Sequence, residues 1–251
     1  MLKPVKIENL RDRVISLACS AGSNGAHVGS SLSLLEILYV CISQKELNVI
    51  LSKGHGALGL YVVLEHFNYI SSQDTESFNK NGTRFFCHAM KDSKKKIEFS
   101  GGSLGLGLPF TVGKAITSPK KEFVVIIGDG ELDEGICWES LLFCSQNQPK
   151  NLTIIIDRNN QQSDGYKDDI ISQRNLFDKL SGWGFKLFEV DGHNPEEIFN
   201  ALKTKINLTK VIIANTIKGK GYSLFEDNPE WHYGIISEKL LSDLKNDGKS
   251  K

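Results

Sequence analysis

The second half of the chain alternates between short apolar runs and longer segments in which apolar residues recur at helical spacing. Four segments predict strands: EFVVIIG (122–128), LTIIID (152–157), FKLFEVDG (185–192) and VIIANT (211–216). Three intervening segments predict helices: EGICWESLLFCSQN (134–147), QRNLFDKLSGWG (173–184) and NPEEIFNALKTKI (194–206). Strand–helix alternation with short connections predicts an α/β fold, a parallel sheet with helices on both faces.

The first half of the chain is predicted to be mostly helical, with polar loops that carry glycine. Helical spacing of apolar residues marks four segments: 5–20, 31–43, 57–67 and 104–116. The loops between them include AGSNGAHVGSS (21–31) and LSKGHG (51–56), and residues 80–104 are loop-rich. Because no internal repeat or low-complexity linker interrupts the chain, we expect one domain over residues 1–251, with a frayed tail from about Leu241.

Composition narrows the class of protein. The chain has 30 basic and 30 acidic residues, and this balance argues against nucleic acid or an anionic membrane as a partner. No apolar run is long enough for a membrane span, and the N-terminal MLKPVKIENLRDR lacks the apolar core of a signal peptide. Five cysteines without metal or redox spacing are expected to be reduced thiols in a cytoplasmic protein, with Cys137 and Cys144 as core residues on one helix face.

Acidic and glycine residues follow the first of the four predicted strands. In GDGELDEG, Asp129 comes directly after that strand, and Asn159 lies thirty residues on, just past the next strand. The carboxyl ends of parallel strands share one edge of the sheet, where open α/β sheets bind ligands. One carboxylate and one amide oxygen form a partial shell for Mg²⁺, which keeps phosphate oxygens and water as further ligands. Gly128 and Gly130 permit close approach of a phosphate, so the pattern predicts a diphosphate–Mg²⁺ site.

The GDG motif, followed after about thirty residues by asparagine, resembles the thiamine diphosphate fingerprint. Seven segments are similar to the N-terminal part of transketolases: LSKGHG, IEFSGGSLGLGL, GDGELDEGICWES, NLTIIIDRNNQQSDG, EVDGHN, TIKGKG and NPEWH. The similarity covers about residues 8–236, and SKGHG and GGSLGLG separate it from the α subunits of 2-oxoacid dehydrogenases. It implies the parallel-sheet thiamine diphosphate-binding fold, in its diphosphate-binding form.

The resemblance implies a cofactor site and a metal site. Asp129 and Asn159 would ligate Mg²⁺, or another divalent cation such as Ca²⁺ or Mn²⁺, through their side chains, and Gln161 through its backbone carbonyl. The residues matched to cofactor binding are His55, Gly102, Ser103, Leu104, Asp129, Gly130, Glu134, Asn159 and His232. Within this set Glu134 matches a glutamate of the family's subunit interface.

Four histidines match residues that bind hydroxyls and move protons at the donor carbonyl in transketolases. His27 matches the substrate-side histidine, although AHVGSS stands where SGHPGGS is usual. His55 in SKGHG and His232 in NPEWH match residues that contact the diphosphate. His88 in FFCHAM lies where a GHP motif is usual.

The chain resembles only the first of the three transketolase domains. The pyrimidine-binding domain, which supplies the glutamate that helps to activate the cofactor, would come from a second chain. We therefore expect a split transketolase, an α₂β₂ heterotetramer that moves a two-carbon ketol unit from a ketose (phosphate) to an aldose (phosphate). Two alternatives stay open: a specialised thiamine-dependent carboligase and a non-catalytic cofactor-binding partner. A plain nucleotide-binding domain is disfavoured because the chain has no GxGxxG or P-loop motif.

The chain also departs from the family pattern at the expected site. Leu106 stands where glutamine is usual, in LGLG, and the loop before LSKGHG is short. Both changes are expected near the entrance or the cofactor, so they favour an unusual acceptor, such as a specialised sugar or the acceptor of an acyloin transfer in secondary metabolism. Donor, acceptor and pathway stay open.

Overall fold

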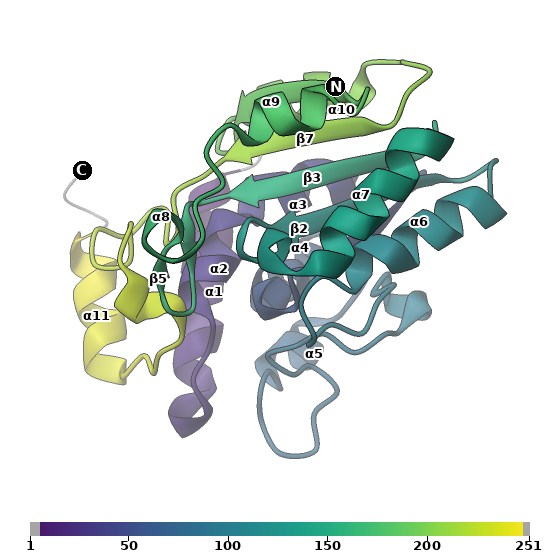
Figure 1. Cartoon of the computed structure of the whole chain (residues 1–251). Coiled ribbons are helices and arrows are strands. Elements are labelled where there is room, and N and C mark those ends of the chain that lie inside the picture. Colours follow the sequence, from purple (N-terminus) through teal and green to yellow (C-terminus); the bar gives the residue numbers. More distant parts are fainter. Residues whose placement is uncertain (1–5, 248–251) are drawn as a thin grey trace.

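The computed structural model describes residues 6–247 (Figure 1). Its centre is a five-stranded sheet in the order β1-β2-β3-β7-β6, with every neighbouring pair parallel. The strands are β1 (Leu47–Leu51), β2 (Glu122–Gly128), β3 (Leu152–Arg158), β6 (Lys186–Asp191) and β7 (Lys210–Asn215). A two-residue antiparallel hairpin, β4 (Gln161–Gln162) and β5 (Gly165–Tyr166), follows β3.

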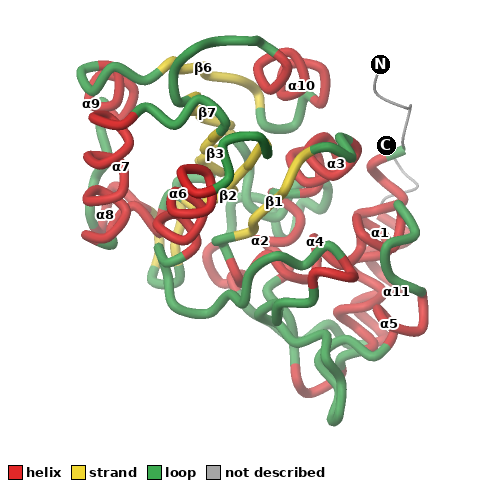
Figure 2. Tube along the Cα trace, turned by 90° about the vertical axis from the view of Figure 1, so that its right-hand side faces the viewer, coloured by secondary structure: helices red, strands yellow, loops and turns green. Residues whose placement is uncertain are grey.

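Helices cover both faces of the sheet, as predicted (Figure 2). One layer consists of α1 (Ile7–Ser20), α2 (Val28–Ser33), α3 (Leu35–Ser43), α4 (Ala57–His66) and α10 (Pro195–Lys203). The opposite layer consists of α6 (Gly107–Thr117), α7 (Gly135–Asn147) and α9 (Leu176–Ser181). The remaining α-helices are α5 (Ser72–Glu76), α8 (Lys167–Ile170) and α11 (Glu238–Asp247).

The alternation of side chains along β2 explains why both layers are needed. Val124 and Ile126 are buried in the cluster formed with α1–α4 and α10, while Val125 and Ile127 are buried in the cluster formed with α6, α7 and α9. A strand that is apolar on both faces is typical of parallel sheets covered on both sides. The near-continuous FVVII run was therefore a sound basis for predicting this fold.

Most predicted elements are confirmed, with boundaries shifted by a few residues. Asn194 caps α10, because its Oδ1 accepts hydrogen bonds from the backbone N–H groups of Glu196 (3.1 Å) and Glu197 (3.4 Å), with Pro195 at the first position. The helix predicted over 173–184 is shorter, since Asn175 adopts a left-handed conformation and α9 begins only after it. The helix predicted over 31–43 is two helices, α2 and α3, separated at Leu34.

Two segments of regular structure were not predicted from the sequence. Residues 47–51 were not predicted as a strand, yet LNVIL forms the edge strand β1. Within residues 6–247 it pairs with β2 alone, and its first three residues are half-exposed. The tail from Leu241 was predicted to be frayed, but α11 continues to Asp247 and buries Leu244 against the α1 layer. The predicted tail residues 248–251 lie outside the described part of the chain.

The cysteines are all free thiols, as expected, and Cys137 and Cys144 are both fully buried on the sheet side of α7. Among residues 6–247 no helix is long and apolar enough to cross a membrane.

Candidate active site at the carboxyl ends of the strands

The segments that follow the five parallel strands meet at one edge of the sheet. Ser52 to His55 follow β1, Asp129 and Gly130 follow β2, and Asn159 follows β3. Thr216 to Lys218 follow β7. A cavity of about 190 Å³ opens at this edge, and its walls come from the β1, β2 and β3 segments together with loops from elsewhere in the chain. Its lining residues are His27, Ser30, Lys53, His55, His88, Leu104, Gly128, Asp129, Gly130, Glu131, Asn159, Gln161, Gln162, Ser163 and His232.

Asp129 is buried at the wall of this cavity. Its Oδ1 accepts a hydrogen bond from Gly130 N (2.9 Å), and its Oδ2 accepts one from Asn160 N (2.6 Å), so the loops after β2 and β3 are tied together. Burial, and secondarily the nearby Asp157 carboxylate, raises the pKa of Asp129 to about 7. A carboxylate held in so dry a position would be stabilised in its charged form by a cation in the cavity.

Asn159 and Gln161 border the same wall, as predicted. The side chain of Asn159 is oriented from both ends: its Nδ2 donates to Asp157 (3.1 Å), and its Oδ1 accepts from Gln161 N (3.1 Å). The Nε2 of Gln161 donates to Asp227 (2.6 Å). The structure thus brings the predicted metal ligands Asp129, Asn159 and Gln161 to one cavity.

A buried ion pair beneath the cavity was missed by the sequence analysis. Lys53 is 2% exposed and its ammonium is paired with the fully buried carboxylate of Asp157. Asp157 also accepts hydrogen bonds from Ser33 and Thr216. The Lys53 ammonium holds the pKa of Asp157 below its usual range despite complete burial. Lys53 lies in the SKGHG motif, and Asp157 lies in NLTIIIDRNNQQSDG at the end of a predicted apolar strand. A charged residue in that position could have indicated a buried ion pair.

The four predicted catalytic histidines line the cavity together. The ring of His27 has its centroid 5.8 Å from that of His55, 5.4 Å from that of His88 and 5.3 Å from that of His232. The rings of His55 and His232 are 5.4 Å apart. These residues come from four separate loops, so their convergence is a property of the fold.

Burial keeps these imidazoles neutral. It is the main cause that lowers the pKa of His27 to about 4 and that of His232 to about 3, and it also lowers the pKa values of His55 and His88. Neutral imidazoles can each donate one hydrogen bond and accept another.

Lys218 extends the set of site residues beyond those predicted. It is 2% exposed, and its Nζ lies 2.9 Å from His232 Nδ1 and 3.3 Å from the carbonyl oxygen of Gln162. Burial, followed by the charge of Lys53, lowers the pKa of Lys218 to about 8. Since a protonated lysine only donates, Nδ1 of His232 accepts, and the remaining ring proton is on Nε2.

Glu131 is a second acidic residue that the sequence analysis did not single out. It is 1% exposed and accepts hydrogen bonds from Ser52 Oγ (2.7 Å), Gly105 N (2.8 Å) and Gly128 N (2.8 Å). It therefore fastens three loops around the cavity, and the GGSLGLG segment is held against the end of β2 by this contact.

Three predicted cofactor residues lie outside the cavity wall. Gly102 and Ser103 are exposed beside it. Their loop touches the loop of Gly54, because a Cβ added to Gly54 would lie only 3.0 Å from the backbone N of Gly102. Glu134 is exposed at the N-terminus of α7 and its side chain makes no capping hydrogen bond. Leu104, by contrast, lines the cavity. The roles implied for all these residues stay predictions.

The DGHN turn after β6 supports the site from behind. Nε2 of His193 accepts a hydrogen bond from Ile217 N (2.8 Å), so Nδ1 carries the proton and faces Glu36 Oε2 at 3.2 Å. Glu36 is in turn paired with the buried Arg11, and Arg11 Nε donates to Lys220 O (3.0 Å). This network holds the loop of Lys218 from both sides.

Unpartnered buried atoms show that the cavity suits a polar ligand. Among the described residues, four such side-chain atoms belong to residues of its wall: His27 Nδ1, Ser30 Oγ, His88 Nδ1 and Gln161 Oε1. Buried polar groups are normally hydrogen-bonded, so these atoms call for a partner. Oxygen donors beside a desolvated carboxylate fit a hard divalent cation, and the buried lysines and glycine-bearing loops fit a diphosphate. The residues present therefore fit thiamine diphosphate with a divalent cation.

Comparison with known protein families identifies the domain. Residues 12–247 match the family described as transketolase, thiamine diphosphate binding domain. The chain is thus a thiamine diphosphate-binding domain of the transketolase type, and it belongs to the transketolase family.

Individual relatives differ in length. The chain is 32% identical to one subunit of the apulose-4-phosphate transketolase of Actinobacillus succinogenes, over 96% of this chain and 95% of that protein. It is 30% identical to human transketolase over 95% of its own length but only 42% of the human chain. The transketolase structure from Campylobacter jejuni aligns with a TM-score of 0.83 at 25% identity, covering 98% of this chain and 43% of that one.

Proposed function

We propose that this chain is the thiamine diphosphate-binding subunit of a two-chain transketolase, which moves a two-carbon ketol unit between sugars. The observation that carries the proposal is the single cavity that joins the oxygen ligands Asp129 and Asn159 to four neutral histidines. Bound thiamine diphosphate would supply the nucleophilic carbon that ketol transfer requires.

The residues of the chain would divide into two groups. Asp129, Asn159 and the backbone carbonyl of Gln161 would hold a divalent cation, with Lys53 and Lys218 adding positive charge toward the diphosphate. The histidines would bind sugar hydroxyls and shuttle protons at the donor carbonyl, for which neutral rings with one free nitrogen are suited. The Nε2–H of His232 would serve as a donor, because Lys218 occupies the other ring nitrogen.

A partner chain is supported by the lengths of the relatives. The chain covers 95% of the apulose-4-phosphate transketolase subunit, and 42% of human transketolase. The parts of a transketolase that this chain does not match would be supplied by a partner, in a heterotetramer with cofactor at the interfaces. The relatives named for apulose-4-phosphate and for 6-deoxy-6-sulfo-D-fructose both act on sugars with an anionic group, and we propose the same class of substrate here.

The proposal is tested by co-purifying the chain with the product of a neighbouring gene that encodes a pyrimidine-binding domain. Ketol transfer is then assayed with thiamine diphosphate, Mg²⁺ and a panel of ketose phosphates, sulfo sugars and free ketoses. We expect transfer only from the pair. A stable pair that binds cofactor but transfers nothing from any donor would favour a non-catalytic or different carboligating role. A chain that binds neither partner nor cofactor would contradict the proposal.

A further inference from the structure

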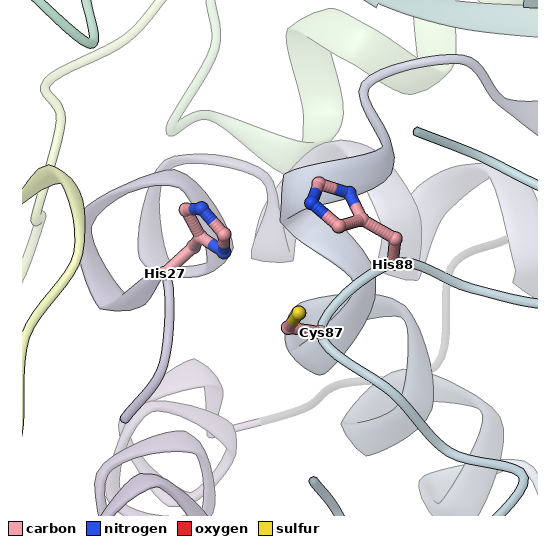
Figure 3. Close-up of side chains that lie close together, drawn as sticks. All are labelled: His27, Cys87 and His88. Atoms are coloured by element: carbon pink, nitrogen blue, oxygen red, sulfur yellow. The ribbon is translucent and has the colours of Figure 1, made fainter. Parts of the chain in front are cut away.

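A nitrogen–sulfur cluster lies within the site, apart from the oxygen ligands. One ring nitrogen each of His27 and His88 and the Sγ of Cys87 lie within 4.8 Å of one another. Figure 3 shows the two rings turned toward each other, with the sulfur of Cys87 pointing into the space between them. His27 comes from the loop before α2, and Cys87 and His88 come from the loop-rich segment after α5, so the fold itself assembles the cluster.

Two ring nitrogens of the cluster lack a hydrogen-bond partner among the described residues. They are Nδ1 of His27 and Nδ1 of His88, and both are buried. Burial lowers the pKa of both rings and keeps them neutral. The neutral imidazole is the form that coordinates a metal. Cys87 is a free, half-buried thiol. The sequence reads CHA where transketolases usually have GHP, so the usual transketolase site does not account for this thiol.

We propose that His27, Cys87 and His88 form a binding site for a zinc-type transition metal ion. Two imidazole nitrogens and one thiolate are a ligand set that Zn²⁺ prefers, and three protein ligands leave a fourth tetrahedral position open. Tetrahedral bonds of about 2.0–2.3 Å place ligand atoms about 3.3–3.7 Å from one another. Ligand atoms that lie within 4.8 Å of one another therefore need to approach by at most about 1–1.5 Å to bind one ion. The site is distinct in chemistry from the oxygen-rich wall of Asp129 and Asn159, which suits Mg²⁺.

Metal bound here would block ketol transfer. His27 and His88 line the cavity and are both proposed to face the sugar, so an ion between them withdraws their nitrogens from the substrate. Zn²⁺ would thus act as a reversible inhibitor competing with the sugar. The inhibition rests on the proposed function, whereas the binding of the metal does not.

Binding is tested on the purified chain in excess Mg²⁺, which occupies oxygen sites. Co²⁺ is used as a spectroscopic probe, and Zn²⁺ affinity is measured by competition with a chromophoric chelator. We expect one equivalent of Co²⁺ with a thiolate-to-metal charge-transfer band. In Cys87→Ser the band disappears, and Zn²⁺ binds more than about tenfold more weakly, since even loss of an outer-sphere contact costs that much. His66→Gln, which removes an exposed histidine, is the matched control and leaves both unchanged.

A measurement on the unmodified chain guards against a misfolded variant. Alkylation of each cysteine is followed by mass spectrometry with and without Zn²⁺, and we expect Zn²⁺ to protect Cys87 selectively. Equal alkylation of Cys87 in both samples, or a thiolate band that survives in Cys87→Ser, would overturn the site.

The inhibitory effect is tested with the assembled pair of subunits. Zn²⁺ at micromolar concentration is expected to raise the apparent KM for the sugar in the wild type and in His66→Gln, but not in Cys87→Ser, whose activity without Zn²⁺ stays unchanged. If the wild-type pair shows the cobalt–thiolate band but its ketol transfer is insensitive to Zn²⁺, the metal site stands and the proposed inhibition is wrong. Absence of transfer without Zn²⁺ would speak against the proposed function alone.

Discussion

At the scale of single residues, a buried charge at the end of β3 supports the residues that line the cavity. Asp157 does not line the cavity, yet it receives hydrogen bonds from Asn159, Ser33 and Thr216 and is paired with Lys53. Removing one member of a buried ion pair typically costs about 3–5 kcal/mol, because the other charge is left uncompensated. This pair therefore supports Asn159 from below and orients it, while Asp129 and Asn159 line the cavity.

The first prediction concerns Asp129. Asp129→Asn removes the buried negative charge and is expected to abolish Mg²⁺-dependent binding of thiamine diphosphate. The fold is expected to be retained, because the amide oxygen can still accept from Asn160 N and only the hydrogen bond from Gly130 N is lost. Calorimetric titration with cofactor and Mg²⁺, in the presence of the partner, measures the effect. Asp169→Asn alters an exposed carboxylate of α8 and serves as the control. Cofactor affinity equal to that of the wild type would remove Asp129 from the metal site.

The second prediction concerns His232. His232→Asn is expected to lower kcat by about 10²–10⁴-fold, the range for loss of a positioned acid or base, with normal assembly. Steady-state kinetics of the assembled pair separate kcat from KM, and His66→Asn is the matched control. A kcat within twofold of the wild type would show that His232 is a structural residue.

At the scale of elements, all five parallel strands end at the same edge of the sheet, and the loop after each strand contributes to the site or supports it. Even β6, whose turn does not reach the cavity, supplies His193, which binds the backbone of Ile217 and so holds the loop after β7. Glu36 in α3 orients that histidine from the opposite side. Packing between helix and loop thus determines where Lys218 and His232 lie.

The third prediction follows from this support. His193→Leu removes the hydrogen bonds to Ile217 and Glu36, and the loop of Lys218 should become mobile. We expect cofactor affinity to fall by about tenfold, the effect of about 1.4 kcal/mol, with kcat at saturating cofactor close to normal. His193→Gln, which can still accept from Ile217 N, should recover part of the affinity. A loss of thermal stability without any change in cofactor affinity would contradict a positioning role.

For the whole molecule, the buried histidines make stability depend on pH. Since the pKa values of His27 and His232 are lowered to about 4 and about 3, the unfolded chain binds more protons than the folded chain below about pH 6.5. Stability contributed by the neutral rings is therefore present above that pH and is lost as the pH falls. Asp129, whose pKa is raised to about 7, and Glu131, whose pKa burial also raises, act in the opposite sense. Four histidines with lowered pKa values outnumber these two acids, so the histidines determine the direction.

The fourth prediction is that the Tm of the chain, free of metal and cofactor, falls between pH 7 and pH 5. Scanning calorimetry across this range measures it, with His66→Asn as control. His232→Asn should flatten the decline, because it removes one group that must be charged on unfolding. A decline of the same steepness in that variant, or a Tm that rises toward pH 5, would contradict the argument.

Local patterns in the sequence determined much of this structure. Short apolar runs predicted β2, β3 and β7, because a strand covered on both faces must be apolar throughout, and the mixed segment FKLFEVDG predicted the edge strand β6. Asp129 and Asn159 were predicted to meet because parallel strands end at one edge. The signal was weak for β1, since an edge strand with one partner needs less apolar surface, and for α11, whose polar sequence conceals the single buried Leu244.

What only the tertiary structure decided is which distant residues share the cavity. The sequence by itself determined a parallel sheet and placed Asp129 and Asn159 at one edge of it, where it predicted a diphosphate and metal site, because periodicity and strand-end chemistry are local. It could not place His27 against His88 and Cys87, or pair Lys53 with Asp157, because these contacts join segments about 60 to 100 residues apart and depend on how the loops pack at the edge of the sheet. The burial that neutralises the histidines has the same origin, since desolvation belongs to the packed site and not to any one residue.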